Sequence, residues 1–361
     1  MRKKINFDYL NLWKEIFLFW RLVVKKKRNG SEKPAKILIV NPCLIGEFAA
    51  SMPAISDFIK RNKDKIIDIV VSPPLKTLAE KIIGVRNVFI AQSVYKRKSE
   101  NFDQEIQNFD TYEQIIFLRI SRDSYNLVKK IKADKIKANA WLFSKYAFHL
   151  LKSVIFKRTP RQWGELNFEL LGGAPRNIAF EEIFNFKNED YDKIKKLEEL
   201  RTTEKKIIIH TGSNWPMKKW NNEKWAELIQ RIHALGNFRF IFVGIKDDEG
   251  DYAHISSKLG FRIYSLVGKI NLMELMLVLR ASDYFIGVDS GPKNMAYLAD
   301  VRSIAILGPG PHFFMPANQN HAALTKSNGR GLYQMFFCKK NNFIEKITVD
   351  DAYKAFIKLI C

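Results

Sequence analysis

A carboxylate follows the first predicted strand of the chain. In "KILIVNPCLIGEFAASMPAI", residues 36–55, an apolar run passes through a tight turn at Gly46 and Glu47 into a helix. A carboxylate at the end of a strand could take a proton from an attacking hydroxyl as a general base. Glu47 could equally be a first-turn carboxylate that favours the N-terminus of the helix. Taken alone, the residue leaves both interpretations open.

Two later loops have the composition of anion-binding sites. The first is "HTGSNWPMKKW", residues 210–220, in which Thr211 and Ser213 carry hydroxyl groups and Lys218 carries a charge. Backbone N–H groups beside a glycine, together with hydroxyls and an ammonium, could bind a phosphate. The alternative is an ordinary basic loop whose tryptophans pack locally.

The second loop is "GVDSGPKNMAYLA", residues 287–299. Asp289 ends a predicted strand, Ser290 and Gly291 form the turn, and Pro292 suits the first position of the next helix. The exposed N–H groups at such a helix start favour an anion, and the glycine lets that anion approach the backbone. Asp289 and Ser290 could instead be no more than caps of the helix.

These loops need a scaffold that brings strand ends together, and the hydrophobic pattern predicts one. Apolar strands alternate with helices, which indicates α/β domains with parallel sheets covered on both faces. The predicted strands are 37–41, 66–71, 87–91, 114–118, 206–210, 238–244, 262–266, 283–288 and 302–307. The predicted helices are 53–62, 123–133, 222–235, 248–259, 271–281, 291–299 and 348–360.

The alternation weakens between about residues 160 and 200 and then restarts, which predicts two doubly wound, Rossmann-like domains facing each other across a cleft. We place these domains at 36–185 and 186–345. Residues 1–35 are expected to form a separate basic helix and linker. Residues 346–361 are expected to form a C-terminal helix that packs back on the first domain.

The charge is strongly positive and unevenly distributed. Lys and Arg number 60 against 38 Asp and Glu, a formal net charge of +22. Residues 1–36 carry 11 basic and 3 acidic side chains, and residues 119–161 carry 12 and 2. Such concentration predicts an anionic partner, for which Arg119 and Arg122 just after a strand are candidate ligands. The alternative is a solvated basic face. Because the chain shows no recognisable RNA- or DNA-binding motif, we do not expect a nucleic-acid partner.

The segment "INFDYLNLWKEIFLFWRLVVKKKR", residues 5–28, combines a wide apolar helical face, two tryptophans and a terminal basic cluster. This composition suits a helix that lies in the surface of an anionic membrane. It could instead pack on the protein's own core. Charged residues interrupt it, so it lacks the apolar run that a membrane-spanning helix needs.

The remaining metal and redox candidates are sparse. The cysteines, Cys43, Cys338 and Cys361, are scattered and fit a reducing, cytoplasmic setting. The histidines show no convincing ligand spacing, so no catalytic metal and no resident cofactor are expected. The histidines considered are His210, His233, His254 and His312.

Several of these motifs together resemble glycosyltransferase family 9, the lipopolysaccharide heptosyltransferases. The stretches that carry the resemblance are "ILIVNPCLIGEFAASMPAI", "IIIHTGSNWPMKKW", "FIFVGIKDDE", "LVGKINLMELMLVLRASDYFIGVDSGPKNMAYLA" and "SIAILGP". They span most of residues 36–310 in the family's order and spacing, so together they are more specific than any single motif.

The resemblance implies a GT-B fold, with an N-terminal acceptor domain and a C-terminal domain for the nucleotide-sugar donor. It implies metal-independent transfer with inversion, from ADP-heptose to a lipid-A-linked acceptor, at the inner face of a bacterial cytoplasmic membrane. Glu47 matches the position of the family's proposed base. The residues implied to bind the donor are Thr211, Ser213, Lys218, Gly268, Ile270, Asp289, Ser290, Gly291, Pro292, Lys293 and Asn294.

The chain departs from the family's pattern at two of these positions. Glu47 stands where the family has Asp, which lengthens the side chain by one methylene. Asn294 stands where the family usually has His, and Lys293 beside it could supply the missing charge. These changes leave open a transferase of the same fold that uses another nucleotide sugar, or a non-catalytic membrane-associated relative.

Overall fold

The computed structural model describes most of the chain, which divides into two compact units. The first unit holds the described residues between 36 and 138 together with Gly164–Asn185, and the second holds Phe186–Cys361. The residues described are 36–93, 111–119, 121–128, 131–138, 163–213, 215–308, 319–326 and 343–361. The helix expected to lie on a membrane, residues 5–28, falls outside them. No helix within these ranges is both long enough and apolar enough to cross a membrane.

The first unit is built on a parallel sheet with the strand order β3-β2-β1-β4-β5. Its strands are β1 (Lys36–Asn41), β2 (Ile66–Val71), β3 (Val85–Ile90), β4 (Tyr112–Phe117) and β5 (Ala133–Ala138). Its helices are α2 (Ile45–Arg61), η1 (Pro73–Leu75), α3 (Lys76–Ala79), α4 (Arg122–Val128), α6 (Trp163–Leu171) and α7 (Phe180–Ile183). Leu38 and Val40 of β1 pack in one core with Leu127 of α4. Because side chains alternate along a strand, the buried Ile37 and Ile39 point to the opposite face of the sheet.

Two predicted helices in this unit have different bounds. The helix expected from residue 53 begins earlier, at Ile45. The residues before 53 favour a helix because they include two alanines and, in the first turn, the carboxylate of Glu47. The helix expected over 123–133 ends at Val128, and β5 follows it. The sequence did not reveal β5 because half of this edge strand, ADKIKA, is charged and it exposes Lys135 and Lys137.

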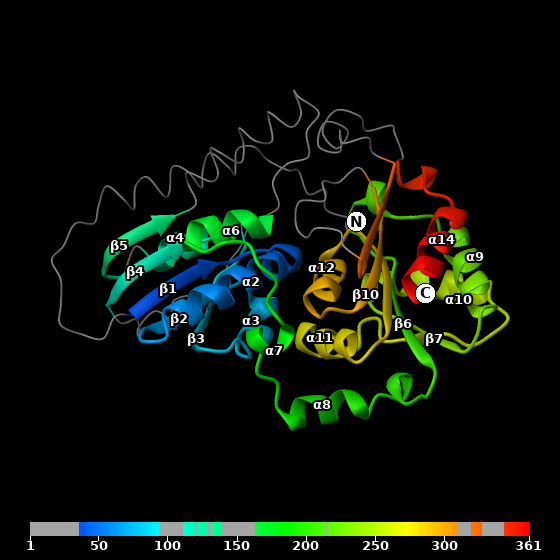
Figure 1. The fold of residues 1–361 in the computed structure, drawn as a ribbon, viewed down its shortest axis with the longest axis horizontal. Helices are drawn as coiled ribbons and strands as arrows, with labels where there is room; N and C mark the ends of the chain where they lie inside the picture. The colour runs from blue at the N-terminus through cyan, green and yellow to red at the C-terminus, as the bar shows by residue number, and fades with distance from the viewer. Residues whose placement is uncertain are drawn as a thin grey trace. The chain divides into compact units, whose positions relative to one another are not determined.

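The second unit is built on a parallel six-stranded sheet with the order β11-β10-β9-β6-β7-β8. Its strands are β6 (Lys205–His210), β7 (Phe238–Phe242), β8 (Tyr264–Ser265), β9 (Tyr284–Val288), β10 (Arg302–Leu307) and β11 (His321–Thr325). Helices α11 (Leu272–Arg280) and α12 (Gly291–Leu298) lie on one side of it, with α9 (Asn222–His233), α10 (Glu249–Ser257) and α14 (Val349–Ile360) on the other (Figure 1). The remaining helical segments are α8 (Asn188–Lys195), η3 (Glu198–Leu200), η4 (Pro216–Lys218), η5 (Lys246–Asp248) and η6 (Ile344–Lys346). The short edge strand β11 was not predicted.

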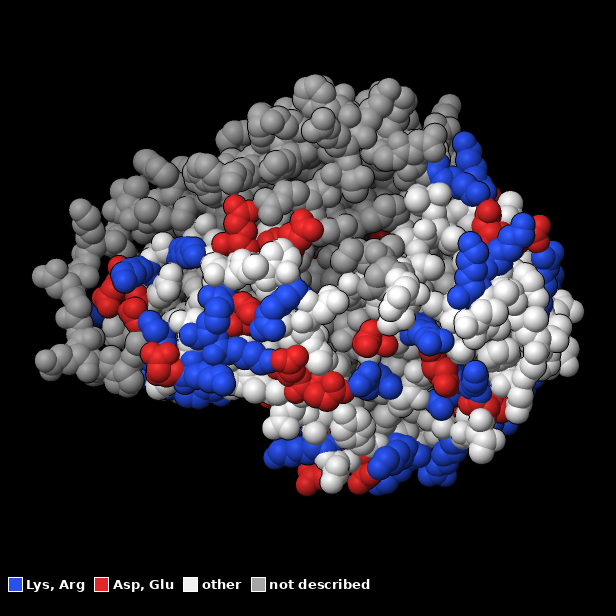
Figure 2. Space-filling view, in the orientation of Figure 1, with Lys and Arg blue, Asp and Glu red and all other residues white. Residues whose placement is uncertain are grey.

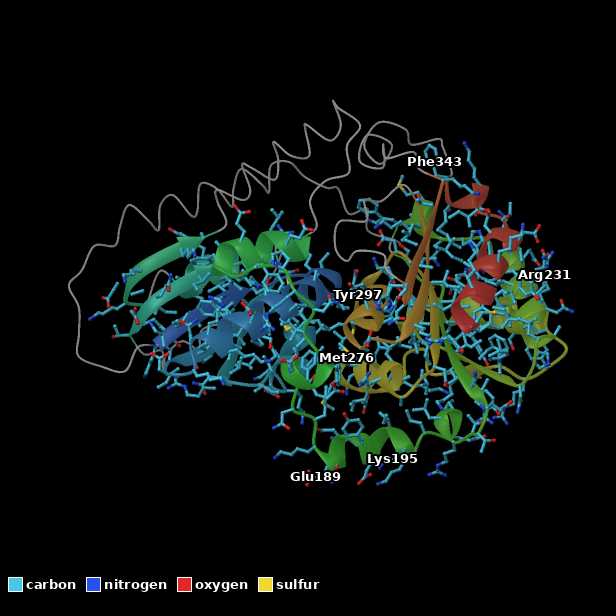
Figure 3. All side chains as sticks on the ribbon, in the orientation of Figure 1. Glu189, Lys195, Arg231, Met276, Tyr297 and Phe343 are labelled. Carbon is cyan, nitrogen blue, oxygen red and sulfur yellow. The ribbon has the colours of Figure 1, made fainter. Side chains whose placement is uncertain are left out.

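The C-terminal helix α14 packs within the second unit, and the expectation that it packs back on the first domain stays a prediction. Phe356 and Leu359 of α14 are buried in the core of the second unit, and the helix contacts α9, β10 and β11. Trp220 Nε1 donates to the backbone oxygen of Ile347, 3.0 Å away, just before the helix. Arg231 of α9, labelled in Figure 3, forms an ion pair with Asp350 of α14. The apolar face of α14 therefore completes the second sheet's own cover.

Charge on the described surface is mixed. Figure 2 shows Lys and Arg interspersed with Asp and Glu over both units. The two segments that hold most of the net positive charge, 1–36 and 119–161, lie largely outside the described residues. The basic acceptor surface predicted there stays a prediction.

Both sheets reverse their strand order beside their first strand. In the first unit the chain moves from β1 outward through β2 and β3 and then returns to β4 on the other side of β1. In the second unit it moves from β6 through β7 and β8 and returns to β9. Such switch points, at the carboxyl ends of the strands, are where doubly wound sheets bind ligands. The loops after β1 and β4, and after β6 and β9, are thus the places to look for a site.

Candidate active site

The switch point of the first sheet holds what we call the Glu47 cluster: Glu47, Arg119 and the backbone N–H of Leu44. Glu47 lies in the first turn of α2, directly after β1. Arg119 follows β4, and its backbone N–H donates to the oxygen of Val40 in β1, 3.1 Å away. The pairing of β1 with β4 therefore brings together two residues that are 72 positions apart in the chain.

Both oxygens of the Glu47 carboxylate have partners. Oε1 accepts a hydrogen bond from Arg119 Nη2, and Oε2 accepts from the backbone N–H of Leu44 at 3.2 Å. The Glu47 and Arg119 side chains are 6% and 9% exposed, so the ion pair is nearly closed to water. Leu44, at the start of the same helix, is 48% exposed, so the turn itself reaches the surface. The expected base and one expected acceptor ligand thus contact each other.

Cys43 lies beside this ion pair. It is buried, and Ser72 Oγ donates to its backbone oxygen at 2.8 Å. Burial raises the pKa of the Cys43 thiol well above its usual range, and the Glu47 carboxylate adds to the effect. The thiol is therefore protonated and acts as an apolar wall of the cluster rather than as a nucleophile.

The switch point of the second sheet holds what we call the Asp289 cluster: Lys218, Asp289, Lys293 and Asn294. Lys218 comes from the loop after β6, and the other three follow β9. Asp289 Oδ2 accepts from Lys218 Nζ at 2.5 Å, and its Oδ1 lies 3.9 Å from Lys293 Nζ. Four of the donor-site residues expected from the sequence are thus brought together by adjacent strands.

The Asp289 cluster contains two ammonium groups and one carboxylate. The side chains of Asp289 and Lys293 are 6% and 9% exposed, and that of Lys218 is 19% exposed. Burial lowers the pKa of Lys293; the Asp289 carboxylate opposes this shift and the Lys218 charge adds to it. An anion that approached these lysines would compensate the excess of positive charge.

The start of α12 contributes backbone donors to the same place. Ser290 is the N-cap of this helix and Pro292 lies in its first turn. Ser290 Oγ donates to the oxygen of Val288 at 3.1 Å, and its expected role as a phosphate ligand stays a prediction. The N–H groups of the first turn, beginning at Gly291, are the groups that an anion could meet here.

Asn294 is oriented by the same helix start. Its Nδ2 donates to the oxygen of Ser290 at 3.2 Å, whereas its Oδ1 is buried and makes no hydrogen bond. Because a backbone oxygen can only accept, the amide nitrogen must face it and Oδ1 must face away. Asn294 therefore presents an acceptor at Oδ1, while its amide nitrogen keeps a second N–H that can donate.

The loop after β6 is held in place by its backbone and by Trp215. Ser213 Oγ accepts from the N–H of Trp215 at 3.2 Å, and Lys218 Nζ lies 5.2 Å from the centre of the Trp215 ring. A Cβ at Gly308, just after β10, would come within 2.6 Å of the oxygen of Met217. The missing side chain at Gly308 lets the loop seat against the end of β10 and presents Lys218 to Asp289.

The other expected donor-site residues lie along the same sheet edge. Thr211 is buried directly after β6. Gly268 has a φ of +68° and donates to the oxygen of Gly244 at 2.9 Å, which places it beside the loop after β7. Ile270 follows two residues later and is half-buried. These three residues are near neighbouring strand ends, but they are not part of the Asp289 cluster itself.

Sequence reasoning missed Asp248. Its carboxylate accepts from the N–H of Ile245 at 3.0 Å and lies against two glycines. A Cβ at Gly212 or Gly244 would come within 2.3 or 2.5 Å of its oxygens. The two glycines, one just after β6 and one just after β7, were the available signal for a side chain packed between those strand ends.

The last two expectations concern Arg122 as an acceptor ligand and the metal. Arg122 is the first residue of α4, and its side chain lies outside what the structure describes. Within the described ranges, no group of three or more His, Cys, Asp or Glu side chains is placed to hold a metal ion.

A comparison with known families identifies the chain. The sequence model of glycosyltransferase family 9 (heptosyltransferase) matches residues 120–336, more than half of the chain. The chain belongs to glycosyltransferase family 9. The resemblance inferred from the motifs is thereby confirmed.

Curated proteins similar to this family 9 chain match it over part of their length. Lipopolysaccharide heptosyltransferase 3 of Escherichia coli is 28% identical over 112 residues, 30% of this chain and 32% of that protein. Lipopolysaccharide heptosyltransferase 1 of Campylobacter coli is 28% identical over 144 residues, 38% of this chain and 42% of that protein. The matched stretches thus span less than half of these relatives.

Solved structures confirm the fold of the family 9 chain over nearly its whole length. A family 9 glycosyltransferase from Veillonella parvula aligns with a TM-score of 0.71 at 17% identity, covering 92% of this chain and 99% of the other. The Escherichia coli heptosyltransferase WaaC with ADP aligns with a TM-score of 0.65 at 18% identity, covering 90% and 99%. The α/β, GT-B fold expected from the sequence is therefore confirmed.

Proposed function

We propose that this family 9 protein is an inverting, metal-independent heptosyltransferase. It moves a heptose from ADP-heptose to an anionic, lipid-A-linked acceptor of lipopolysaccharide. The proposal further places it in the cytoplasm, at the inner face of the cytoplasmic membrane of a bacterium, with residues 5–28 on the membrane surface. Membership of family 9 supports the reaction class.

The observation that carries the proposal is the Asp289 cluster. Lys218 and Lys293 lie on the two sides of one carboxylate, directly beside the N-terminus of α12. The diphosphate of a nucleotide sugar gains negative charge as it leaves, and two ammonium groups with a helix start would stabilise that charge. These groups supply the positive charge that a divalent cation supplies in other transferases, which is why we propose metal independence.

Glu47 is the proposed base. The hydroxyl of the acceptor loses its proton to the carboxylate as its oxygen forms a bond with the anomeric carbon. The bond from that carbon to the diphosphate oxygen breaks, and ADP leaves. Such a direct displacement by one nucleophile inverts the anomeric configuration. The position of Glu47 at the switch point of the first sheet supports this role.

The first experiment identifies the donor by measuring release of the nucleotide. Purified protein is mixed with ADP-heptose, and release of ADP is followed with and without a heptose-deficient lipopolysaccharide acceptor, in the presence and absence of EDTA. We expect acceptor-dependent release of ADP that EDTA does not change. ADP-glucose and UDP-sugars serve as matched donors that differ in the sugar or the base.

Two results would contradict the proposal in different ways. Release from a UDP-sugar but not from ADP-heptose would make the protein a transferase with another donor, for which the acceptor atom of Asn294 would be the first residue to examine. Binding of ADP in calorimetry without turnover of any donor would make it a non-catalytic relative.

A further inference from the structure

An aromatic ring lies beside the Lys218 ammonium that the proposed function uses. Nζ of Lys218 lies over the face of the Trp215 ring, 5.2 Å from its centre. The ring is half-buried and the Lys218 side chain is 19% exposed, so water only partly screens the contact. At this separation the negatively polarised face of an indole attracts a cation, more strongly where water is excluded. Trp215 therefore acts on the charge that we propose to meet the diphosphate.

The local sequence holds these two side chains together. Trp215 is the N-cap of η4, and its backbone oxygen accepts from the N–H of Lys218 at 2.9 Å. Side chains three residues apart in a 3₁₀ turn lie one above the other, so Lys218 extends over Trp215. Pro216 fixes one backbone angle of the turn, and the N–H of Trp215 donates to Ser213 Oγ at 3.2 Å. The stretch Trp-Pro-Met-Lys thus forms the contact before any ligand arrives.

The ring differs from the other partner of Lys218 in its charge. Asp289 Oδ2 accepts from Lys218 Nζ at 2.5 Å. Because that carboxylate is an anion, a bound diphosphate competes with it for the N–H groups of the ammonium. The Trp215 ring carries no net charge, so it does not repel the diphosphate and leaves the charge of Lys218 in place. When the diphosphate receives an N–H that Asp289 had bound, the contact with the ring can persist.

We propose that Trp215 is a positioning residue for the transfer: its ring keeps the Lys218 ammonium at the second switch point while Asp289 yields to the diphosphate. This proposal rests on the proposed function and adds a neutral partner to the Asp289 cluster. Trp215 acts through Lys218 and not by touching the donor. An aliphatic side chain at position 215 would let the ammonium turn toward water, which costs part of the charge stabilisation that Lys218 supplies.

The first test measures kcat/KM for ADP-heptose in a cycle of variants. Trp215→Leu should lower it on the order of 5-fold, the size of one cation–π contact. Trp215→Phe keeps a ring face and should retain more activity than the leucine variant. In the Lys218→Met background, Trp215→Leu should lower kcat/KM no further, because the cation that the ring attracts is absent. In the matched background Lys219→Met, the loss should remain in full, since Lys219 pairs with Asp251.

Two outcomes of this cycle would overturn the proposal. A Trp215→Leu protein that is folded by circular dichroism and as active as the unaltered protein would show that the ring contributes nothing. An equal loss from Trp215→Leu in the unaltered and Lys218→Met backgrounds would show that the ring acts on the donor or on the loop, and not through Lys218.

The second test uses the unaltered protein and needs no turnover. Lysines are labelled with ¹³C at Cε, and the Lys218 signal is identified by its loss in Lys218→Met. Protons over the face of an aromatic ring resonate at a lower chemical shift, so the Cε protons of Lys218 should lie below the values of exposed lysines. Most of this displacement should persist when ADP is bound, as measured by calorimetry. A Lys218 signal at the ordinary position, or one that returns to it when ADP binds, would contradict the proposal.

The positioning role and the proposed function fail in distinguishable ways. If the unaltered protein releases no ADP from ADP-heptose, the proposed function fails, and the Lys218 signal still decides whether the ring holds the ammonium. If the unaltered protein transfers heptose and Trp215→Leu does so at the same kcat/KM, the proposed function stands and the role of Trp215 is excluded.

Discussion

The two units place a carboxylate and a cation at the same topological position, but in opposite order. In the first unit the carboxylate, Glu47, follows the first strand of the sheet and the cation, Arg119, follows the strand that returns beside it. In the second unit the cation, Lys218, follows the first strand and the carboxylate, Asp289, follows the returning strand. The switch points of the two sheets thus each hold a carboxylate and a cation, but on exchanged strands.

The two clusters also differ in their charge balance. The Glu47 cluster has one cation for one carboxylate, whereas the Asp289 cluster has a second cation, Lys293, within 3.9 Å of the carboxylate. A balanced, buried pair is suited to holding a reactive group in place, and its breaking is costly. A pair with an additional cation attracts an anion. The comparison supports our proposal of proton transfer at the first cluster and diphosphate binding at the second.

The largest expected effect comes from removing the base. Glu47→Gln should lower kcat for heptose transfer by about 10²–10⁴-fold, because an amide cannot take the proton of the acceptor. Affinity for ADP, measured by calorimetry, should stay unchanged because the base lies in the other unit. Glu47→Asp keeps a carboxylate and should retain more activity than the amide. Equal activity of Glu47→Gln and the unaltered protein would remove the first half of the comparison.

Removing the shared cation of the second cluster should have the next largest effect. Lys218→Met should lower kcat/KM for ADP-heptose on the order of 10²-fold, the loss typical of one preorganised group that stabilises developing charge. Lys219→Met is the matched control, since Lys219 pairs with Asp251 at 2.6 Å and not with Asp289. The assignment of the diphosphate would be wrong if the two variants behaved alike.

The additional cation should affect binding more than turnover. Lys293→Met should weaken ADP binding on the order of 10-fold, about 1.4 kcal/mol, as for a single hydrogen bond to a charged group. Burial holds the pKa of Lys293 below its ordinary value, and a bound diphosphate would raise it again. Binding therefore takes up a proton, and affinity should fall as the pH rises through the lowered pKa.

The pH dependence of calorimetric ADP affinity tests this point. The charged or titratable groups that act on Lys293 are Asp289, Lys218 and His321. The fall in affinity at rising pH should be absent from Lys293→Met and present in Lys219→Met. A slope that is the same in both variants would show that another group is responsible.

The smallest effect on turnover is expected from His321, which limits the positive charge near Lys293. Burial lowers the pKa of His321 to about 4, and its Nδ1 lies 2.7 Å from Ser303 Oγ. Its ring packs 4.2 Å from that of Tyr297 on α12, the residue labelled in Figure 3. The folded protein thus keeps this histidine neutral at a pH where the unfolded chain protonates it.

The lowered pKa of His321 makes the folded protein less stable in acid. Stability is fully present above pH 6.5 and falls as the pH drops toward 4, by about 3 kcal/mol at the lower limit. His321→Asn removes this dependence and should leave heptose transfer at pH 7.5 unchanged. Urea unfolding of both proteins between pH 7.5 and 5 measures it, and parallel curves would rule out the assignment.

Much of the fold was predictable because its signals are local. β1 and β6 each contain a continuous apolar run, residues 37–40 and 207–209, as is typical of strands covered on both faces, and the helices between the strands carry one apolar face. The strands that the sequence did not predict lie at sheet edges, and packing partners were also not readable from it. β5 exposes its lysines and reads as polar, and the partner of α14 depends on which apolar surface remains uncovered. No local pattern encodes either fact.

For the candidate site, too, some features were readable from local sequence and others were not. Glycines, caps and strand ends marked Glu47, Lys218 and Asp289 as candidates, because turns and helix starts have residue requirements that can be read locally. The sequence by itself therefore determined the fold class, the family and the loops in which we propose the chemistry. Only the tertiary structure decided which of these residues meet: Glu47 with Arg119, and Asp289 with Lys218 and Lys293. The reason is that strand order brings together residues distant in the chain, and burial then makes their charges act strongly on one another.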